Sequence, residues 1–138
     1  MKLDWAMLAN HAEVQNGLAY INGGAIDTVN ALEAPVAFVG SLVFRLTLHP
    51  TELDRPHQIE IQILAEDGQQ IAELKGQSQV PASSETALPK GWDAGALLSF
   101  GLTGLRLPRF GFYSIEILID GNHAKSIPFR AVQLRTES

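Results

Sequence analysis

Three tight-turn dipeptides constrain the fold of this chain more than any other feature of its sequence. Asn16-Gly17, Asp67-Gly68 and Asp120-Gly121 each stand between two stretches of strand-like residues. Asn, Asp and Gly tolerate the positive φ angles that a two-residue turn requires, so such pairs are typical of tight β-hairpins. The sequence therefore predicts three hairpins.

Alternation of apolar and polar residues predicts the strands on both sides of these turns. Ile59, Ile61 and Ile63 alternate with glutamine and glutamate, and residues 42–48 and 113–119 alternate in a similar way. A period of two is typical of a strand with one face in a core and the other in water.

The last expected strand contains a proline, Pro128, between Ile127 and Phe129. Proline has no N–H group to donate to a neighbouring strand. We therefore expect this strand at a sheet edge, or with the donor side of Pro128 facing solvent.

The first hairpin is less regular than the other two. Residues 18–21 have a strand pattern, which Asn22-Gly23-Gly24 interrupts. Paired glycines inside a strand indicate a bulge or a bend between sheets. Residues 31–44 are apolar enough for a helix, but Pro35 and Gly40 argue against one.

These patterns predict an all-β fold, an antiparallel β-sandwich of the immunoglobulin-like kind with about seven to eight strands. The chain has 138 residues and a mass of 15.0 kDa. Two domains of half this length would each have a core near the lower limit of independent stability. We therefore expect a single domain over residues 1–138.

A polar segment, residues 76–93, interrupts the strand pattern and is predicted to be a long loop. Its large apolar residues are Val80, Leu88 and Trp92. Loops of this length in compact domains are usually functional or disordered. One interpretation is a flexible crossover between two sheets, with Trp92 folded back onto the core. The other is a binding loop in which Trp92 anchors a partner.

Charge and composition exclude several classes of partner. The formal net charge of −5 gives no electrostatic footprint of a nucleic-acid-binding protein. The longest uncharged apolar run, residues 34–44, is too short to span a bilayer, and residues 1–5 show no secretory signal. The chain contains no cysteine, so nothing favours an oxidising compartment. We expect a cytoplasmic protein with no nucleic-acid or membrane partner.

One short region groups side chains that can bind metal or transfer protons: His49, Glu52, Asp54 and His57. Such a set could form the site of a metal-dependent hydrolase. Two prolines and Arg55 beside Asp54 fit a rigid polar turn with its own ion pair at least as well. We favour the polar turn, and we expect no metal and no cofactor.

The remaining sequence contains no catalytic motif. His11 and His123 are isolated, and no serine stands in a Gly-x-Ser-x-Gly elbow. Gly23-Gly24 lacks the following Lys-Ser or Lys-Thr of a phosphate-binding loop. We therefore predict that the protein is not an enzyme and name no catalytic residue.

Short motifs are spread over nearly the whole chain. They are residues 8–14 (LANHAEV), 17–21 (GLAYI), 23–24 (GG), 55–57 (RPH), 66–68 (EDG), 90–93 (KGWD), 111–113 (GFY), 119–121 (IDG) and 127–129 (IPF). With these motifs the chain resembles a family of uncharacterised bacterial single-domain proteins, mainly actinobacterial and described as a domain of unknown function. The resemblance implies an immunoglobulin-like fold and no activity.

Tyr113, after Gly111-Phe112, also resembles a feature of immunoglobulin-like sandwiches. In many of them a tyrosine near the start of the penultimate strand bonds back to the preceding corner. The Cys-Trp-Cys core of antibody domains is absent here. We therefore expect a sandwich fold, and this fold by itself does not indicate a function.

Our first functional hypothesis is a non-enzymatic module for protein–protein interaction or assembly, which binds another protein or itself. Leu64 and Leu118 break the polar outer face of their strands, so with Trp92 they are the candidate partner-binding residues. The alternative is a small-ligand or carbohydrate-binding β-sandwich in which Trp92, Trp5 or Tyr20 stacks on a ring. The metal-dependent hydrolase ranks third.

Overall fold

The computed structural model describes residues 1–81 and 92–135, which form an all-β fold with one short 3₁₀ turn, η1 (Pro50–Glu52). The strands are β1 (Lys2–Gln15), β2 (Leu18–Gly24), β3 (Thr28–Ala31), β4 (Val36–Ala37), β5 (Ser41–Leu48), β6 (His57–Ala65), β7 (Gln70–Ser78), β8 (Ala94–Gly101), β9 (Arg106–Leu107), β10 (Gly111–Ile119) and β11 (Asn122–Gln133). No helix among the described residues is long and apolar enough to cross a membrane.

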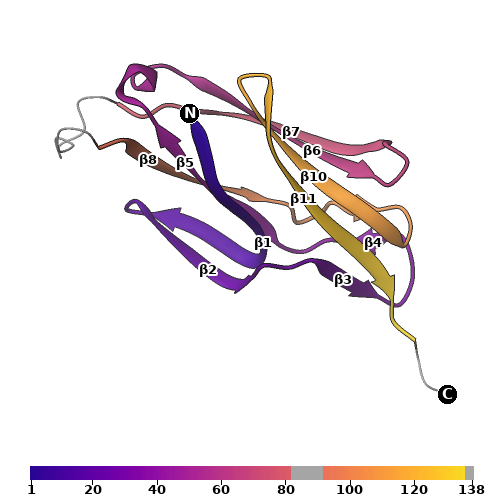
Figure 1. Cartoon of the computed structure of the whole chain (residues 1–138). Helices are drawn as coiled ribbons and strands as arrows, with labels where there is room; N and C mark the ends of the chain where they lie inside the picture. The colour runs from indigo at the N-terminus through magenta and orange to yellow at the C-terminus, as the bar shows by residue number, and fades with distance from the viewer. Residues whose placement is uncertain (82–91, 136–138) are drawn as a thin grey trace.

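Four strands form an antiparallel sheet in the order β2-β1-β5-β8 (Figure 1). The turn at Asn16-Gly17 joins β1 to β2, with both residues at positive φ, which confirms the first predicted hairpin. β5 pairs with β1 on one side and with β8 on the other.

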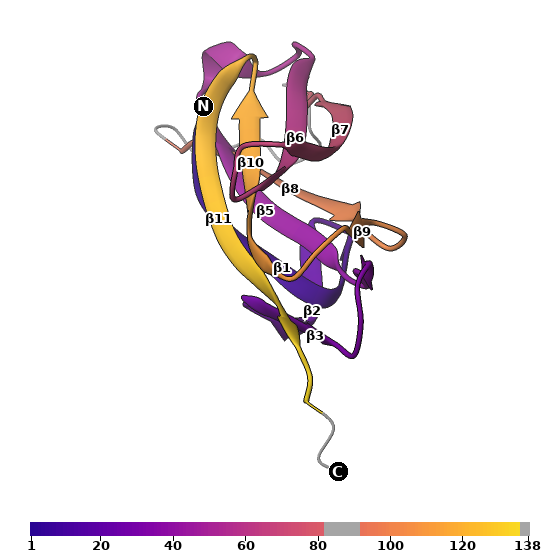
Figure 2. The same cartoon turned by 90° about the vertical axis from the view of Figure 1, so that its right-hand side faces the viewer.

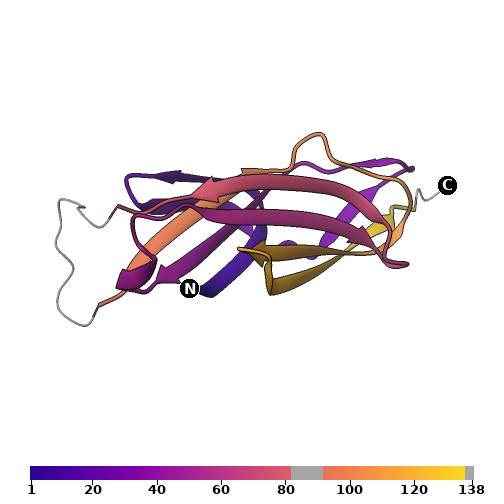
Figure 3. The same ribbon diagram turned by 90° about the horizontal axis from the view of Figure 1, so that it is seen from above.

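Five strands form a second sheet in the order β3-β11-β10-β6-β7 (Figure 2). Turns at Asp67-Gly68 and Asp120-Gly121 join β6 to β7 and β10 to β11, which confirms the other two hairpins. β6 and β7 run side by side along the length of the molecule (Figure 3).

The expected antiparallel arrangement is wrong at one pair, because β3 lies parallel to β11. Thr28 is opposite Arg130, and Ala31 is opposite Gln133. Parallel neighbours need a long connection between them, and the paired residues of these two strands are 102 positions apart. Nothing local in the sequence could therefore indicate their pairing.

The described residues contain eleven strands, more than the seven or eight expected. β4 and β9 contribute two residues each and pair only with each other. Strands this short cannot show a period of two, so alternation does not predict them.

The paired glycines of the first hairpin mark a bend between the two sheets. After Gly24 the chain leaves the four-stranded sheet and enters the five-stranded sheet as β3. Gly23 and Ala25 both have a φ of 61°, which a strand interior does not have. This is one of the two outcomes that the sequence predicted.

Pro128 lies on an edge, as expected. β3 pairs only with residues 130–133 of β11, so beside Pro128 the strand has β10 as its one described neighbour. The missing N–H of Pro128 therefore leaves no gap between two paired strands.

The predicted loop at residues 76–93 begins too early. Residues 76–78 still belong to β7 and pair with residues 57–59 of β6. β7 is an edge strand with many polar side chains, and its composition therefore resembles that of a loop. Residues 82–91, with Leu88 among them, lie outside the described residues.

The main core contains residues from both larger sheets. Ile59, Ile61 and Ile63 of β6 are buried in it, as their alternation predicts, together with the even-numbered residues 42–48 of β5. Full burial of one such side chain contributes about 1.5–3 kcal/mol, so these rows hold the two sheets together.

A smaller apolar cluster lies on the other side of β5. Val43 faces away from the main core, because its neighbours along β5 point into it. It is fully buried with Ala9 and Ala12, and Ala19 and Ile21 of β2 pack against these residues. The β1–β2 hairpin therefore folds back over the outer face of the four-stranded sheet, and Figure 1 shows the bend of β1 that allows this.

Candidate functional site

The region after β5 holds the four side chains of the hypothetical metal site, and two of them build the turn itself. His49 caps η1, because its Nδ1 accepts a hydrogen bond from the Thr51 amide at 3.3 Å. The Glu52 carboxylate accepts one from the His49 amide at 2.8 Å. This reciprocal capping box satisfies amides that a short helix leaves unpaired.

Glu52 also forms an ion pair with the α-amine of Met1. Its Oε2 lies 2.7 Å from the amine nitrogen, and both groups are largely buried. The hydrogen bond from the amine, followed by that from the His49 amide, lowers the pKa of Glu52, although burial acts in the opposite direction. Both oxygens of this carboxylate are thus occupied.

His57 is buried at the start of β6, and each of its ring nitrogens contacts an acceptor. Nδ1 lies 2.7 Å from Oδ2 of Asp120, and Nε2 lies 2.8 Å from the carbonyl oxygen of Glu52. A carboxylate and a carbonyl can only accept, so both nitrogens must donate, which requires the imidazolium form. The other oxygen of Asp120 accepts from the Gln58 amide at 2.9 Å.

The pKa values of this pair shift toward the charged forms. Burial alone would lower the pKa of His57, but its hydrogen bonds to Asp120 and to the Glu52 carbonyl raise it. Burial would raise the pKa of Asp120, but the hydrogen bonds from His57 and the Gln58 amide lower it. An imidazolium has no lone pair with which to bind metal or accept a proton. The geometry therefore makes His57 part of a structural ion pair.

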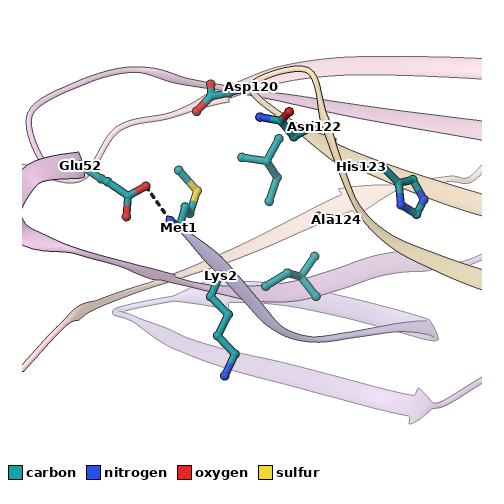
Figure 4. Close-up of a pocket in the computed structure, with 9 residues that line it drawn as sticks. Met1, Lys2, Glu52, Asp120, Asn122, His123 and Ala124 are labelled. Atoms are coloured by element: carbon teal, nitrogen blue, oxygen red, sulfur yellow. Dashed lines mark ion pairs between the residues drawn. The ribbon is translucent and has the colours of Figure 1, made fainter.

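A pocket of about 380 Å³ opens beside this pair, between the start of β1, η1 and the turn from β10 to β11 (Figure 4). It is lined by Met1, Lys2, Leu3, Glu52, Ile119, Asp120, Asn122, His123 and Ala124. Two of its charged groups are neutralised by neighbours, Glu52 by the amine of Met1 and Asp120 by His57, and Nε2 of His123 lies 2.7 Å from the carboxylate of Glu116.

The four side chains proposed for a metal site do not converge on one point. Glu52 lines the pocket of Figure 4, whereas His49, Asp54 and His57 do not. Within residues 1–81 and 92–135, no group of three or more His, Asp or Glu side chains is placed to hold a metal ion. The sequence grouping reflects the construction of a turn.

The three candidate partner-binding residues lie in separate places. Trp92 precedes β8 and is 67% exposed, so the interpretation in which it folds back onto the core is wrong. Leu64 and Leu118 are partly exposed on the outer face of the five-stranded sheet. The polar pair of Glu116 and Gln62 lies between them, so they form no continuous apolar surface.

The aromatic residues proposed to stack on a ligand are also dispersed. Trp5 packs into the small cluster behind β5. Tyr20 lies on β2 and is 50% exposed, and Trp92 stands at the start of β8. None of the three lines the pocket of Figure 4.

The edges of the two larger sheets differ in charge. β7, at one edge of the five-stranded sheet, carries Glu73 and Lys75, and β11 carries Lys125 and Pro128 where β3 does not cover it. β3, at the other edge, has no charge and no proline but is only four residues long. β2 and β8, the edges of the four-stranded sheet, contain no charged residue and no proline. Charges and prolines on an edge strand hinder pairing with another chain. The four-stranded sheet is therefore the more open to such pairing.

A family model described as a family of unknown function (DUF6941) matches residues 4–132, nearly the whole chain. This chain belongs to the DUF6941 family. No curated protein and no solved structure matches it. Membership of DUF6941 confirms the expected domain of unknown function, whereas the bacterial origin and the immunoglobulin-like fold stay predictions.

The DUF6941 match includes the His57–Asp120 pair and both open edge strands. It begins after residues 1–3, which form one wall of the pocket in Figure 4. The pair and the edges thus lie within the family's domain, and part of the pocket lies outside it.

Sequence reasoning missed two features of this DUF6941 domain. Asp120 was assigned to its turn alone, because a contact with a histidine 63 positions earlier leaves no local pattern. The absence of charge in residues 94–101 is visible in the sequence, but the position of that strand at an edge is not. A systematic search for uncharged strands could have named β8 as a candidate.

Proposed function

We propose that the protein is a non-enzymatic protein-interaction module, built as an immunoglobulin-like β-sandwich, that binds its partner through the four-stranded sheet. The partner is another protein or a second copy of the chain. Because the chain contains no cysteine, we place the module in the cytoplasm.

The observation that carries this proposal is the absence of charge and proline from both edges of the four-stranded sheet. A strand edge offers a row of unpaired N–H and C=O groups, and proteins usually block it when no partner is meant to bind. On the five-stranded sheet, β7 and the uncovered part of β11 carry such residues, and the other edge, β3, is only four residues long.

The state of the titratable side chains supports a binding role over catalysis. His57 is held as an imidazolium between two acceptors, and both oxygens of Glu52 accept hydrogen bonds. A general base needs an unoccupied lone pair within reach of a substrate. The imidazolium of His57 offers none, and both oxygens of Glu52 already have partners within the protein.

Site-specific photo-crosslinking in living cells tests the proposal. A photoreactive residue is placed at Ser99 of β8 or Tyr20 of β2, and at Gln62 or Ser126 of the five-stranded sheet as controls. We expect covalent protein adducts from at least one of the first two positions and from neither control. No adduct at Ser99 and Tyr20, or equal adducts at all four, would overturn the proposal.

Small-ligand binding is the second candidate, and the pocket of Figure 4 favours it. Its volume of about 380 Å³ lies in the range of small-molecule sites, about 300–1,000 Å³. Its lining is polar, so small polar metabolites are better candidates than sugars stacked on aromatic rings. A thermal-shift screen in which no polar metabolite raises the melting temperature would eliminate it.

A further inference from the structure

We propose that two copies of this chain pair through β8, edge to edge and antiparallel, so that their four-stranded sheets join into one sheet of eight strands. This inference rests on the proposed function and names both the strand and the partner. The two-fold axis passes through Leu98 of each copy.

β8 has every property of an edge that is open to pairing. It contains eight residues, all without charge, and its outer side has no strand neighbour among the described residues. All eight pair with β5 in unbroken register, from Ala94 opposite Leu48 to Gly101 opposite Ser41. A long, regular and uncharged edge is the best template for another strand.

The other edge of the same sheet is a poorer template. β2 has seven residues, and it ends in Asn22-Gly23-Gly24 with Gly23 at a φ of 61°. A left-handed residue turns the backbone amides out of the plane in which a partner strand would bind. β8 has no residue with positive φ.

The inner face of β8 leaves part of the main core open at this edge. Ala96, Leu98 and Phe100 pack against the core but are only partly buried. Phe100 stacks on Phe44 with ring centroids 5.9 Å apart. A second β8 would cover the exposed sides of these residues with apolar atoms.

The self-pairing is sterically complementary when the axis lies at Leu98. A two-fold axis perpendicular to the sheet keeps each side chain on its own face, so Leu98 meets Leu98 and the large Phe100 meets the small Ala96 of the other copy. On the outer face Leu97 meets Ser99. Large residues thus stand opposite small ones on both faces.

Local charge does not oppose a second copy as the occupant. The charged residue next to β8 on β5 is Arg45, opposite Leu97, and Asp4 neutralises it. Two chains of net charge −5 can therefore meet along β8 without bringing unpaired charges together. An isologous contact of this kind closes after two copies and leaves no β8 edge exposed.

Two double variants test both the interface and its register. In the proposed dimer, residue 97 of one copy faces residue 99 of the other. Leu97→Lys/Ser99→Lys therefore places lysine opposite lysine between the two β8 strands, and Leu97→Lys/Ser99→Glu places lysine opposite glutamate. Like charges in direct opposition cost several kcal/mol, so sedimentation equilibrium should show the dimer dissociation constant rising at least about 100-fold in the first variant. The second variant should dimerise like the unmodified protein. Circular dichroism confirms that both variants fold.

Cysteine substitution provides an independent readout, because the chain has no cysteine of its own. Under mild oxidation Leu98→Cys should form a disulfide-linked dimer, since the axis brings the two copies of residue 98 together. Tyr20→Cys on β2 is the control and should remain monomeric on a non-reducing gel.

Three results would overturn the inference. The first is an unmodified protein that stays monomeric at about 100 μM, a concentration at which even weak dimers form. The second is a dimer that survives Leu97→Lys/Ser99→Lys and is abolished by Tyr20→Lys, which would move the interface to β2 and leave the proposed function standing. The third is failure of Leu97→Lys/Ser99→Glu to restore the dimer, which would exclude the Leu98 register.

Discussion

Asp120 has two structural roles, because its backbone forms a turn and its carboxylate binds a buried histidine. Its backbone has a φ of 50° in the turn between β10 and β11, and its carboxylate holds the His57 ring and the Gln58 amide. The aspartate of an Asp-Gly turn was expected to serve backbone geometry alone. Here it also supplies the counter-charge of a buried histidine.

The first prediction concerns the pH dependence of this pair. The pKa of His57 is raised, so its stabilising contribution is complete below the ordinary value of 6.5 and is lost as pH rises through the raised pKa. Asp120→Asn keeps the turn and removes the charge. We expect it to lower the free energy of unfolding near pH 5.5 by no more than about 1–2 kcal/mol, because the side chain of Asp120 is 43% exposed. The loss should be smaller near pH 9, because His57 loses its charge as the pH rises. Urea unfolding at both pH values measures this difference.

Asp67→Asn is the control, because Asp67 also precedes the glycine of an Asp-Gly turn between two strands. Its partner Arg109 lies 3.1 Å away, and both side chains are more than half exposed. Exposed ion pairs contribute little, so this variant should leave stability almost unchanged at either pH. An equal loss in both variants would show that the His57 contact has no special role.

The second prediction concerns Tyr113, which makes the contact expected of a corner tyrosine. Its hydroxyl donates to the carbonyl of Arg109 at 2.5 Å and accepts from the amide of the same residue at 3.2 Å. Tyr113→Phe removes the hydroxyl that pairs with these two backbone groups and should cost about 0.5–1.5 kcal/mol in chemical unfolding. Tyr20→Phe removes a hydroxyl from a half-exposed ring and should cost almost nothing.

Among the elements, β1 and the start of β5 meet closely at Gly40. A β-carbon there would lie 2.6 Å from the carbonyl oxygen of Ala9, whereas one at Gly101 would meet nothing within 4 Å. The third prediction is that Gly40→Ala destabilises the protein by about 1–3 kcal/mol, as overpacking does, and that Gly101→Ala has little effect. Thermal unfolding of the two variants decides it, and similar melting temperatures would refute the close approach.

At this scale the sequence predicted what depends on neighbouring residues. The three hairpins follow from their Asx-Gly turns, and the buried rows of β5, β6 and β10 follow from alternation. The parallel pairing of β3 was missed because it depends on residues about a hundred positions away. The start of the loop after β7 was misplaced because polar residues suit both loops and exposed edges.

The candidate sites were predicted less well than the strands. His57 and Glu52 were singled out, but only as neighbours in sequence, whereas their partners Asp120 and Met1 come from distant elements. Leu64 and Leu118 do lie on an outer face, yet with polar residues between them. Titratable groups acquire their roles from tertiary contacts, which periodicity does not encode.

For the molecule as a whole, the two apolar clusters differ greatly in size. The main core draws on both larger sheets, whereas the cluster under the β1–β2 hairpin contains three buried residues, Ala9, Ala12 and Val43. Segments with few buried contacts open at lower free energy than the global fold. The fourth prediction is that native-state hydrogen exchange releases the amides of β2 by local opening, well before those of β10.

Two substitutions in the apolar clusters provide a sharper test of this prediction. Val43→Ala should lower the opening free energy of β2 by about 0.5–1.5 kcal/mol or more, since it removes the residue on which the hairpin packs. Ile61→Val, at a fully buried site of the main core, should instead reduce the protection of β10. If the β2 and β10 amides exchanged in one cooperative step, the hairpin would not be a separate unit.

The parallel pair of β3 and β11 has a consequence for how the chain is made. Residues 28–31 are synthesised about a hundred residues before the strand that they bind, residues 130–133. One side of β6 likewise remains unpaired until β10, its neighbour in the sheet, has been synthesised. The five-stranded sheet therefore cannot be completed until residue 133 has been synthesised, and until then the nascent chain must keep β3 unpaired.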